Sequence, residues 1–279
     1  MPSNKIVLLR GGGDLASGVA LRLHRAGIRV VITELAQPLA VRRAVSFSEA
    51  VYAGGHTVEG VKARLIEAEQ LPAWEEANGI PVIIDPDASI LAKSQFTNYQ
   101  FPVVVDARLL KARPKPLPVD VPLHIGLGPG FTAGNDCHAV IETRRSHTLG
   151  RVLWHGGTQP DSGEPEGDPR RVLRAPGAGT MRGLKQIGEH VEAGEVVAVI
   201  SEESTESSEQ LSVLSPLAGV LRGLIHDGLH VPKGLKIGDV DARNDPSMCF
   251  LVSDKALAIG GGVLEAILSK KEIRERLYS

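Results

Sequence analysis

The chain has 279 residues, of which 42% are hydrophobic, and its formal net charge is −2. This length allows two domains with sizeable cores. The near-neutral charge and the aromatic content of 4% argue against a nucleic-acid-binding protein. No apolar run approaches the roughly eighteen residues of a membrane span, and the N-terminus has no signal-peptide layout. We therefore expect a cytoplasmic protein.

The first predicted element is a short buried strand over residues 5–9, which leads into three glycines. Gly11, Gly13 and Ala16 match the pattern G-x-G-x-x-A, and residues 14–26 have helical spacing. The first glycine allows a tight turn, the second lets the backbone approach a phosphate, and the alanine keeps helix and strand close. The helix start then offers free N–H groups and a favourable dipole to an anion.

A second strand over residues 29–33 ends at Glu34, eighteen residues after Ala16, where a carboxylate would accept hydrogen bonds from ribose hydroxyls. This order of strand, glycines, helix, strand and acid is typical of a dinucleotide site. The alternative is that the glycines only make a tight turn. The predicted cofactor-binding residues are Gly11, Gly12, Gly13, Asp14, Leu15 and Glu34.

The following residues fit an α/β sheet less regularly. We expect helices over residues 38–51 and 71–78, and strands over 61–65, 81–84 and 102–105. Asp85 and Asp106 follow the last two strands, so they could share one sheet edge with Glu34. Helix capping and turn formation are equally good explanations of both aspartates.

A proline-rich joint over residues 112–122 predicts a domain boundary. We expect a Rossmann-like nucleotide-binding domain over 1–116, a mainly β domain over 117–252, and a C-terminal helix over 253–279 that packs on the first domain. Residues 123–134 hold four glycines and could bind an anion, although a hairpin or barrel corner explains them as well. Gly260–Gly262 lie inside the C-terminal helical pattern, which favours close packing.

The second half contains an internal repeat at an offset of forty residues. Residues 175–194 and 215–234 are identical at ten of twenty positions, including four glycines and a proline. Because these residues specify backbone conformation, the same local geometry should occur twice, with the halves related by a pseudo-twofold axis. Arg182 and Arg222 recur at the same position, as an anion clamp or as surface or structural arginines.

The repeat resembles the half-motif of biotinyl and lipoyl carrier domains, which implies a closed barrel-sandwich hybrid. Carrier domains hold their modified lysine between the halves, but no lysine occurs between Lys185 and Lys233. A swinging-arm carrier is therefore excluded. No metal-ligand pattern or nucleophile elbow is present, so we predict no metal and name no catalytic residue.

The segments RGGGDLASGVALRLHRAG, AVSFSEAVY, IGLGPGFTAGND, VIETRRSHTLGRV, KIGDVDAR and GGGVLEAIL resemble the YqeB family in this order. The resemblance implies an accessory protein for maturation of a selenium-dependent molybdenum hydroxylase, related in theme to XdhC/CoxF factors. Its partners would be the hydroxylase or its maturation machinery. A glycine is expected at position 146, where this chain has Ser146.

Two function classes remain. In the first, the protein binds an NAD-like dinucleotide or molybdopterin dinucleotide as a maturation factor. In the second, it is an NAD-dependent oxidoreductase for a small molecule. A dehydrogenase should offer a proton-transfer group, and the sequence indicates none, so the first class is favoured. Neither class fixes whether the protein forms a homo-oligomer.

Overall fold

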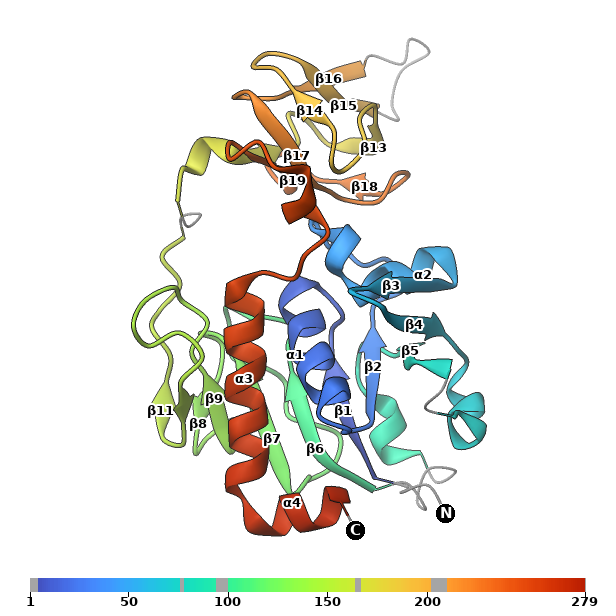
Figure 1. Cartoon of the computed structure of the whole chain (residues 1–279), viewed down its shortest axis with the longest axis vertical. Helices are drawn as coiled ribbons and strands as arrows, with labels where there is room; N and C mark the ends of the chain where they lie inside the picture. The colour runs from blue at the N-terminus through green and yellow to red at the C-terminus, as the bar shows by residue number, and fades with distance from the viewer. Residues whose placement is uncertain (1–4, 76–77, 94–99, 164–166, 202–209, 279) are drawn as a thin grey trace. The chain divides into compact units, whose positions relative to one another are not determined.

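A computed structural model describes the chain except for residues 1–4, 76–77, 94–99, 164–166, 202–209 and 279 (Figure 1). The chain folds into two compact units. The first unit comprises residues 1–38, 46–162 and 252–279, and the second comprises 39–45 and 163–251.

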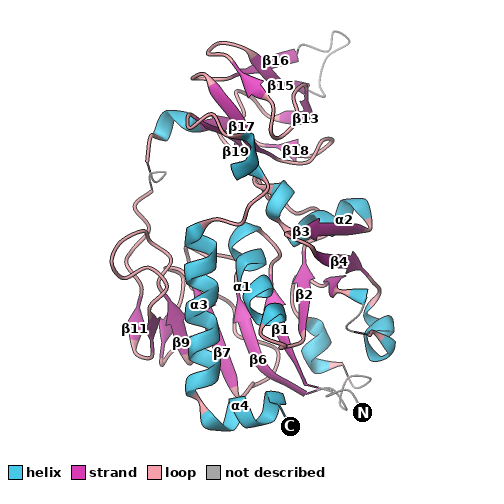
Figure 2. Ribbon diagram, viewed as in Figure 1, coloured by secondary structure: helices cyan, strands magenta, loops and turns pink. Residues whose placement is uncertain are grey.

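A nine-stranded mixed sheet forms the centre of the first unit (Figure 2). Its strand order is β10-β9-β7-β6-β1-β2-β5-β4-β3, and the strands from β9 to β4 run parallel. These parallel strands are β1 (Lys5–Arg10), β2 (Val30–Glu34), β4 (Val61–Leu65), β5 (Ile80–Ile84), β6 (Gln100–Asp106), β7 (Leu123–Leu127) and β9 (Ala139–Ile141). Strands β1 and β2 are almost wholly buried, which explains their continuous apolar runs.

Antiparallel strands close both ends of this sheet. Strand β3 (Gly55–Val58) pairs with β4, and β10 (Val152–Leu153) pairs with β9. A separate two-stranded ladder joins β8 (Thr132–Ala133) to β11 (Gly156–Gly157).

Two helices pack closely against each other in this unit, α1 (Asp14–Arg25) and α3 (Asp254–Ser269). A Cβ added to Gly18 would lie 2.7 Å from the Ala256 backbone, and one added to Gly260 would lie 2.7 Å from the Gly18 carbonyl oxygen. Gly260 thus serves the contact between the two helices, whereas a Cβ on Gly262 would meet the Gly150 carbonyl and one on Gly261 would meet no atom within 4 Å. Helix α3 runs through all three glycines without interruption. A shorter helix, α4 (Lys271–Tyr278), follows.

The predicted helix over residues 38–51 is wrong, because that segment divides into the short helices η1 (Arg43–Val45), η2 (Phe47–Glu49) and α2 (Ala50–Ala53). The predicted helix over residues 71–78 is likewise replaced, within the described residues, by a 3-10 helix that contains Pro72. The remaining short helices are η1 (Arg43–Val45), η2 (Phe47–Glu49), α2 (Ala50–Ala53), η3 (Ala68–Ala73), η5 (Ser89–Ala92), η7 (Pro169–Arg171) and η8 (Pro246–Cys249). Among described residues, no helix is long and apolar enough to cross a membrane.

The second unit contains two four-stranded antiparallel sheets. One has the order β12-β19-β17-β14 and the other β16-β15-β13-β18. The strands are β12 (Val172–Arg174), β13 (Gly179–Gly183), β14 (His190–Val191), β15 (Val196–Ser201), β16 (Gln210–Leu214), β17 (Gly219–Leu224), β18 (His230–Val231) and β19 (Lys236–Asp241).

The two copies of the repeat form equivalent halves of this unit. The Gly188 N–H donates to the Leu221 carbonyl at 2.9 Å, and the matching Gly228 N–H donates to the Met181 carbonyl at 2.8 Å. A Cβ on Gly179 would lie 2.3 Å from the Ser201 oxygen, and one on Gly219 would lie 2.5 Å from the Asp241 oxygen. The expected recurrence of local geometry is therefore seen in the hydrogen bonds and close approaches of both copies.

The predicted fold class, a Rossmann-like domain followed by a barrel-sandwich hybrid, is wrong. The large sheet is mixed, and it includes β7, β9 and β10, which the prediction assigned to a β domain. The proline-rich segment does not separate domains, because it leads from β6 into the adjacent parallel strand β7. The repeat forms two separate sheets instead of one closed β module. The boundary between compact units accordingly falls near residue 162 and not at 116.

Candidate functional site

The glycine turn follows β1 and leads directly into α1. Gly11 has φ +90°, a left-handed conformation that favours glycine, and its N–H donates to the Thr33 carbonyl at 2.8 Å. Gly13 has φ −64°, and a Cβ added there would have no neighbour within 4 Å. The space beside Gly13 is therefore open to a ligand.

Glu34 lies beside this turn at the end of β2, as the sequence predicted. Its side chain is 8% exposed and accepts the N–H of Gly12 at 2.6 Å and that of Leu35 at 2.7 Å. Burial raises the pKa of Glu34 above its ordinary value, although both N–H groups act in the opposite direction. The carboxylate thus fixes the turn and remains close to any group bound there.

The start of α1 carries unused backbone donors. The Leu15 N–H donates to the Asp14 carboxylate at 2.9 Å, and the Ser17 N–H begins the helical ladder at the Gly13 carbonyl. The N–H groups of Gly13 and Ala16 have no acceptor among the described residues. Unused donors at a helix N-terminus, where the dipole is positive, are suited to an anionic oxygen.

The two aspartates that the sequence associated with Glu34 have structural partners. Asp85 caps η5 by accepting the N–H groups of Ser89 at 2.9 Å and Ile90 at 2.8 Å. Asp106 is 1% exposed and pairs with Arg10 at 3.2 Å and Arg108 at 2.6 Å. Capping and charge pairing therefore account for both.

Arg10 and His124 are buried polar residues that the sequence did not single out. Arg10 is 5% exposed, burial lowers its pKa, and its Nε has no partner among the described residues. His124 on β7 is 7% exposed, and burial lowers its pKa to about 4. Its Nε2 also lacks a partner in the described part of the chain. Neither residue belongs to a recognisable sequence motif. Their burial depends on the packing of neighbouring strands, which the local sequence does not report.

The second glycine-rich loop, residues 126–134, is filled by protein. A Cβ on Gly126 would lie 2.3 Å from the Phe131 ring, and one on Gly130 would lie 2.4 Å from the Leu110 carbonyl oxygen. These glycines serve packing, which favours the structural interpretation over an anion site.

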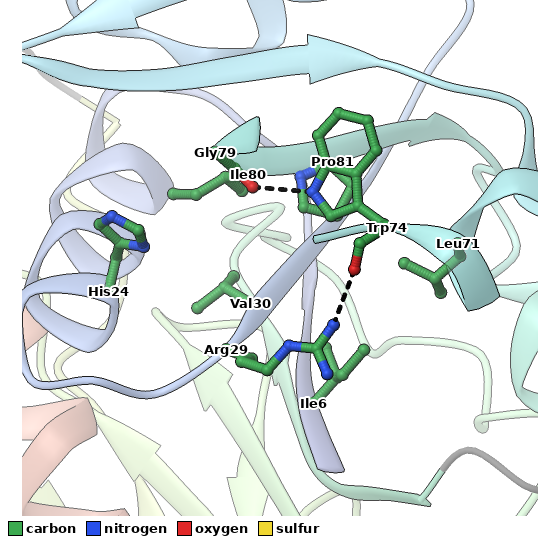
Figure 3. A pocket seen from close by; sticks show the side chains of 9 residues that line it. All are labelled: Ile6, His24, Arg29, Val30, Leu71, Trp74, Gly79, Ile80 and Pro81. Carbon is green, nitrogen blue, oxygen red and sulfur yellow. Dashed lines mark hydrogen bonds between the residues drawn. The ribbon is translucent and has the colours of Figure 1, made fainter. Parts of the chain in front are cut away.

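A small pocket lies at the opposite, amino ends of the parallel strands (Figure 3). Its polar wall is held by two hydrogen bonds, from Arg29 to the Trp74 carbonyl at 3.2 Å and from the Trp74 indole N–H to the Gly79 carbonyl at 2.8 Å. It is separate from the glycine turn, which follows the carboxyl end of β1. Among all the described residues, no group of three or more His, Cys, Asp or Glu side chains could hold a metal ion.

The sequence is similar to that of one known protein along nearly its whole length. The chain is 45% identical over 271 residues to a protein of Escherichia coli K12 described as "Uncharacterized protein YqeB". The chain is similar to YqeB along 95% of its length. It spans about half, 48%, of that relative. The expected resemblance to the YqeB family is confirmed, whereas the relative's description gives no activity. No family model matches the chain.

Solved structures give only distant likenesses. An aspartoacylase family protein from Mesorhizobium loti has a TM-score of 0.30 and 13% identity, with 85% of each chain covered. A succinylglutamate desuccinylase/aspartoacylase from Rhodobacter sphaeroides has a TM-score of 0.29 and 12% identity, again with 85% of each chain covered. Scores this low support no argument about function.

Proposed function

We propose that the protein binds the diphosphate of a dinucleotide or pterin dinucleotide at the glycine turn and the start of α1. The observation that carries this proposal is the open space beside Gly13, next to the unused N–H groups of Gly13 and Ala16. Glu34, held 2.6 Å from the Gly12 nitrogen, is near enough to the turn to accept hydrogen bonds from an adjoining ribose.

The proposed biological role is that of an accessory protein in the maturation of a selenium-dependent molybdenum hydroxylase. This role is supported by the resemblance to the YqeB family, and the proposed diphosphate site at the glycine turn would suit a pterin-dinucleotide cofactor. The test is removal of the protein from its host, followed by measurement of the cofactor content of the hydroxylase. Full cofactor content without the protein would contradict the role.

The binding proposal is tested by Gly13→Val. Valine fits the free protein, because φ is −64° and no atom lies within 4 Å of the added Cβ, but its side chain would occupy the ligand's space. We expect wild-type protein to bind NAD, ADP or CDP in calorimetric titrations and Gly13→Val to lose that binding with its melting temperature retained. Unchanged affinity would show that the site is elsewhere.

Glu34 also makes the proposal selective. A ligand with a 2′-phosphate would bring a second negative charge close to a buried carboxylate. We therefore expect NAD to bind more tightly than NADP. Tighter binding of NADP would contradict the ribose assignment.

The second candidate function is an NAD-dependent oxidoreductase. The observation in its favour is the buried imidazole of His124, whose Nε2 has no hydrogen-bond partner among the described residues. Imidazole is a common proton-transfer group in enzymes, although burial lowers the pKa of His124 to about 4 and so weakens it as a base. Hydride transfer to or from a small substrate, lost in His124→Gln, would favour this candidate.

A further inference from the structure

The two halves of the repeat contact each other through one leucine in only one direction. Reciprocal hydrogen bonds join the halves, so a packing contact made from the second half to the first is expected in reverse as well. A Cβ added to Gly183 would lie 2.9 Å from Leu224 Cδ2, so the leucine of the second half packs on the glycine of the first. The matching contact would place Leu184 of the first half on Gly223 of the second.

A strap formed by residues 39–45 occupies the place expected for Leu184. A Cβ added to Gly223 would lie 2.7 Å from the Val41 carbonyl oxygen and 2.8 Å from Val41 Cγ1. Leu184 is 47% exposed, whereas its counterpart Leu224 is 1% exposed. The strap has therefore taken the surface that the symmetry of the repeat assigns to a leucine, and that leucine lies in solvent.

Arginine side chains hold the strap through hydrogen bonds to backbone carbonyls. Arg43 Nε donates to the Leu224 carbonyl at 3.0 Å. Arg42 donates to the Leu251 carbonyl at 3.0 Å and to the Met248 carbonyl at 3.2 Å, and both of these bonds are exposed. Water competes for the partners of exposed hydrogen bonds, so each contributes little to stability. Segments held in this way open more readily than a buried core.

We propose that the strap is releasable and that Leu184 closes on Gly223 when the strap leaves. The seated state places Val41 on this glycine and exposes Leu184, and the released state reverses both. Because one apolar side chain replaces another on the same surface, burial of Leu184 offsets part of the free energy lost with the strap. A surface with two alternative occupants can act as a two-state switch.

The strap continues directly into the segment that packs on the glycine turn. Val45 and Ser46 are both 0% exposed, and the Ser48 N–H donates to the Gly12 carbonyl at 2.9 Å. A Cβ added to Gly12 would lie 3.2 Å from the Ser48 Cα, so the serine backbone rests against the turn. Release of the strap therefore changes how this segment is anchored. The switch itself does not depend on the proposed nucleotide site.

Hydrogen exchange of the full chain, read by mass spectrometry over residues 39–45, measures release of the strap. Leu184→Ser is compared with Leu214→Ser, because Leu214 is similarly exposed, at 51%, and lies outside both copies of the repeat. Serine cannot replace leucine on Gly223, so Leu184→Ser should destabilise the released state and slow exchange of the strap by about five-fold or more. Leu214→Ser should leave the exchange unchanged.

Equal exchange of residues 39–45 in wild-type protein and Leu184→Ser would overturn the proposal. Exchange of the strap only together with strand β17 would also overturn it, because the strap would then leave only when the whole unit unfolds.

A double-mutant cycle gives a second test. Val41→Asp places a charge against the apolar surface and disfavours the seated strap. Leu184→Ala should then lower the denaturation midpoint of the second unit more in the Val41→Asp background than in wild-type protein, because Leu184 is buried only after release. Additive effects of the two substitutions would show that Val41 and Leu184 do not compete, and the proposal would fail.

Discussion

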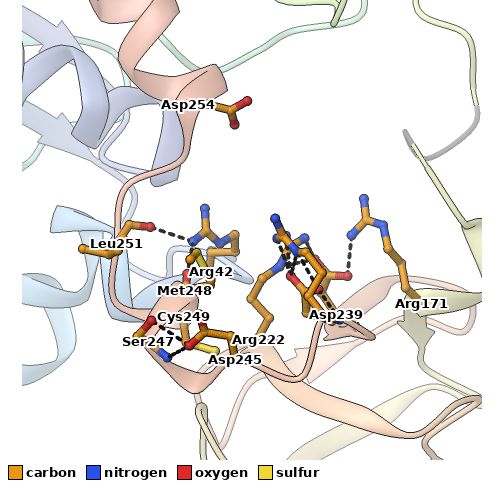
Figure 4. Close-up of polar contacts among 12 residues, drawn as sticks. Arg42, Arg171, Arg222, Asp239, Asp245, Ser247, Met248, Cys249, Leu251 and Asp254 are labelled. Carbon is orange, nitrogen blue, oxygen red and sulfur yellow. Dashed lines mark hydrogen bonds and ion pairs between the residues drawn. The ribbon is translucent and has the colours of Figure 1, made fainter.

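Arg182 and Arg222 occupy the same position in the two copies of the repeat, yet their surroundings differ. Arg182 is exposed and has no partner among the described residues. Arg222 and Arg171 both pair with Asp239 (Figure 4). Arg222 also pairs with Asp241 at 3.4 Å. The first copy has Val199 and Ser201 where the second has these two aspartates. A shared backbone plan thus supports an ion cluster in one half only.

The strand pairing changes at the same place. In the first half, Arg182 pairs with Val199 and Gly183 with Ala198. In the second half, Gly223 pairs with Asp239 and Leu224 with Gly238, so the register shifts by one residue after Leu221. Such a shift marks a β-bulge at Arg222, and bulges redirect side chains. The ion cluster and the bulge therefore occur together.

The two halves also differ in whether another segment of the chain packs on their outer face. A Cβ on Gly223 would lie 2.7 Å from the Val41 oxygen, and Arg43 Nε donates to the Leu224 carbonyl at 3.0 Å. Residues 39–45 thus pack on the second half, where Leu224 is 1% exposed, while its counterpart Leu184 is 47% exposed. Neither arginine forms part of a symmetric anion clamp. Equivalent sequence positions acquired unequal burial because one half binds a segment from another part of the chain.

Replacing Asp239 by valine, the residue of the first half, should give the largest effect. The carboxylate is 1% exposed and pairs with Arg171 and Arg222, so its removal leaves two cations without their shared partner. Breaking a buried pair in this way should lower the free energy of unfolding by about 3 kcal/mol, measured by chemical denaturation. Arg182→Leu is the control and should change it by less than about 0.5 kcal/mol. If Asp239→Val and Arg182→Leu changed the free energy of unfolding equally, the ion cluster would not stabilise the second half more than Arg182 stabilises the first.

Leu224→Ala and Leu184→Ala compare the covering directly. Leu224→Ala should lower the free energy of unfolding by about 2–3 kcal/mol, because truncating this buried side chain leaves a cavity. Leu184→Ala should lower the free energy of unfolding by less than about 1 kcal/mol, because Leu184 is half exposed. Differential scanning calorimetry of the second unit's transition would measure both. A larger loss for Leu184 would show that residues 39–45 do not cover Leu224 in solution.

The smallest expected effect is on the acid sensitivity of the second half. Hydrogen bonding to Arg243, followed by the nearby arginine charges, lowers the pKa of Asp241 to about 2. Because the folded pKa is depressed, Asp241 stabilises the fold above its unfolded pKa, and this contribution is lost as pH falls from about 4 to about 2. Solvent screening limits the loss to roughly 1 kcal/mol. Asp241→Ser, which restores the residue of the first half, should melt with a shallower pH dependence in that range. An unchanged pH dependence would show that Asp241 is not stabilised by these arginines.

The sequence by itself determined the local features of the candidate site. Gly11, Gly13 and Glu34 could be aligned because strand, turn and helix follow one another within about thirty residues, and glycine specifies backbone conformation directly. The same reasoning identified the two copies of the repeat, whose glycines approach equivalent carbonyl oxygens. Alternating and buried apolar runs also indicated most strands of the large sheet.

Only the tertiary structure decided the sheet order, the unit boundary and the partners of buried polar groups. The proline-rich segment has the composition of a linker between domains, yet it connects the adjacent parallel strands β6 and β7. A stiff, extended segment can connect two strands of one sheet as well as two domains. Arg171 and Asp239 lie sixty-eight residues apart, and Ser48 lies thirty-six residues beyond Gly12. No local pattern reports such contacts, since burial and hydrogen-bond satisfaction depend on which distant segments the fold brings together.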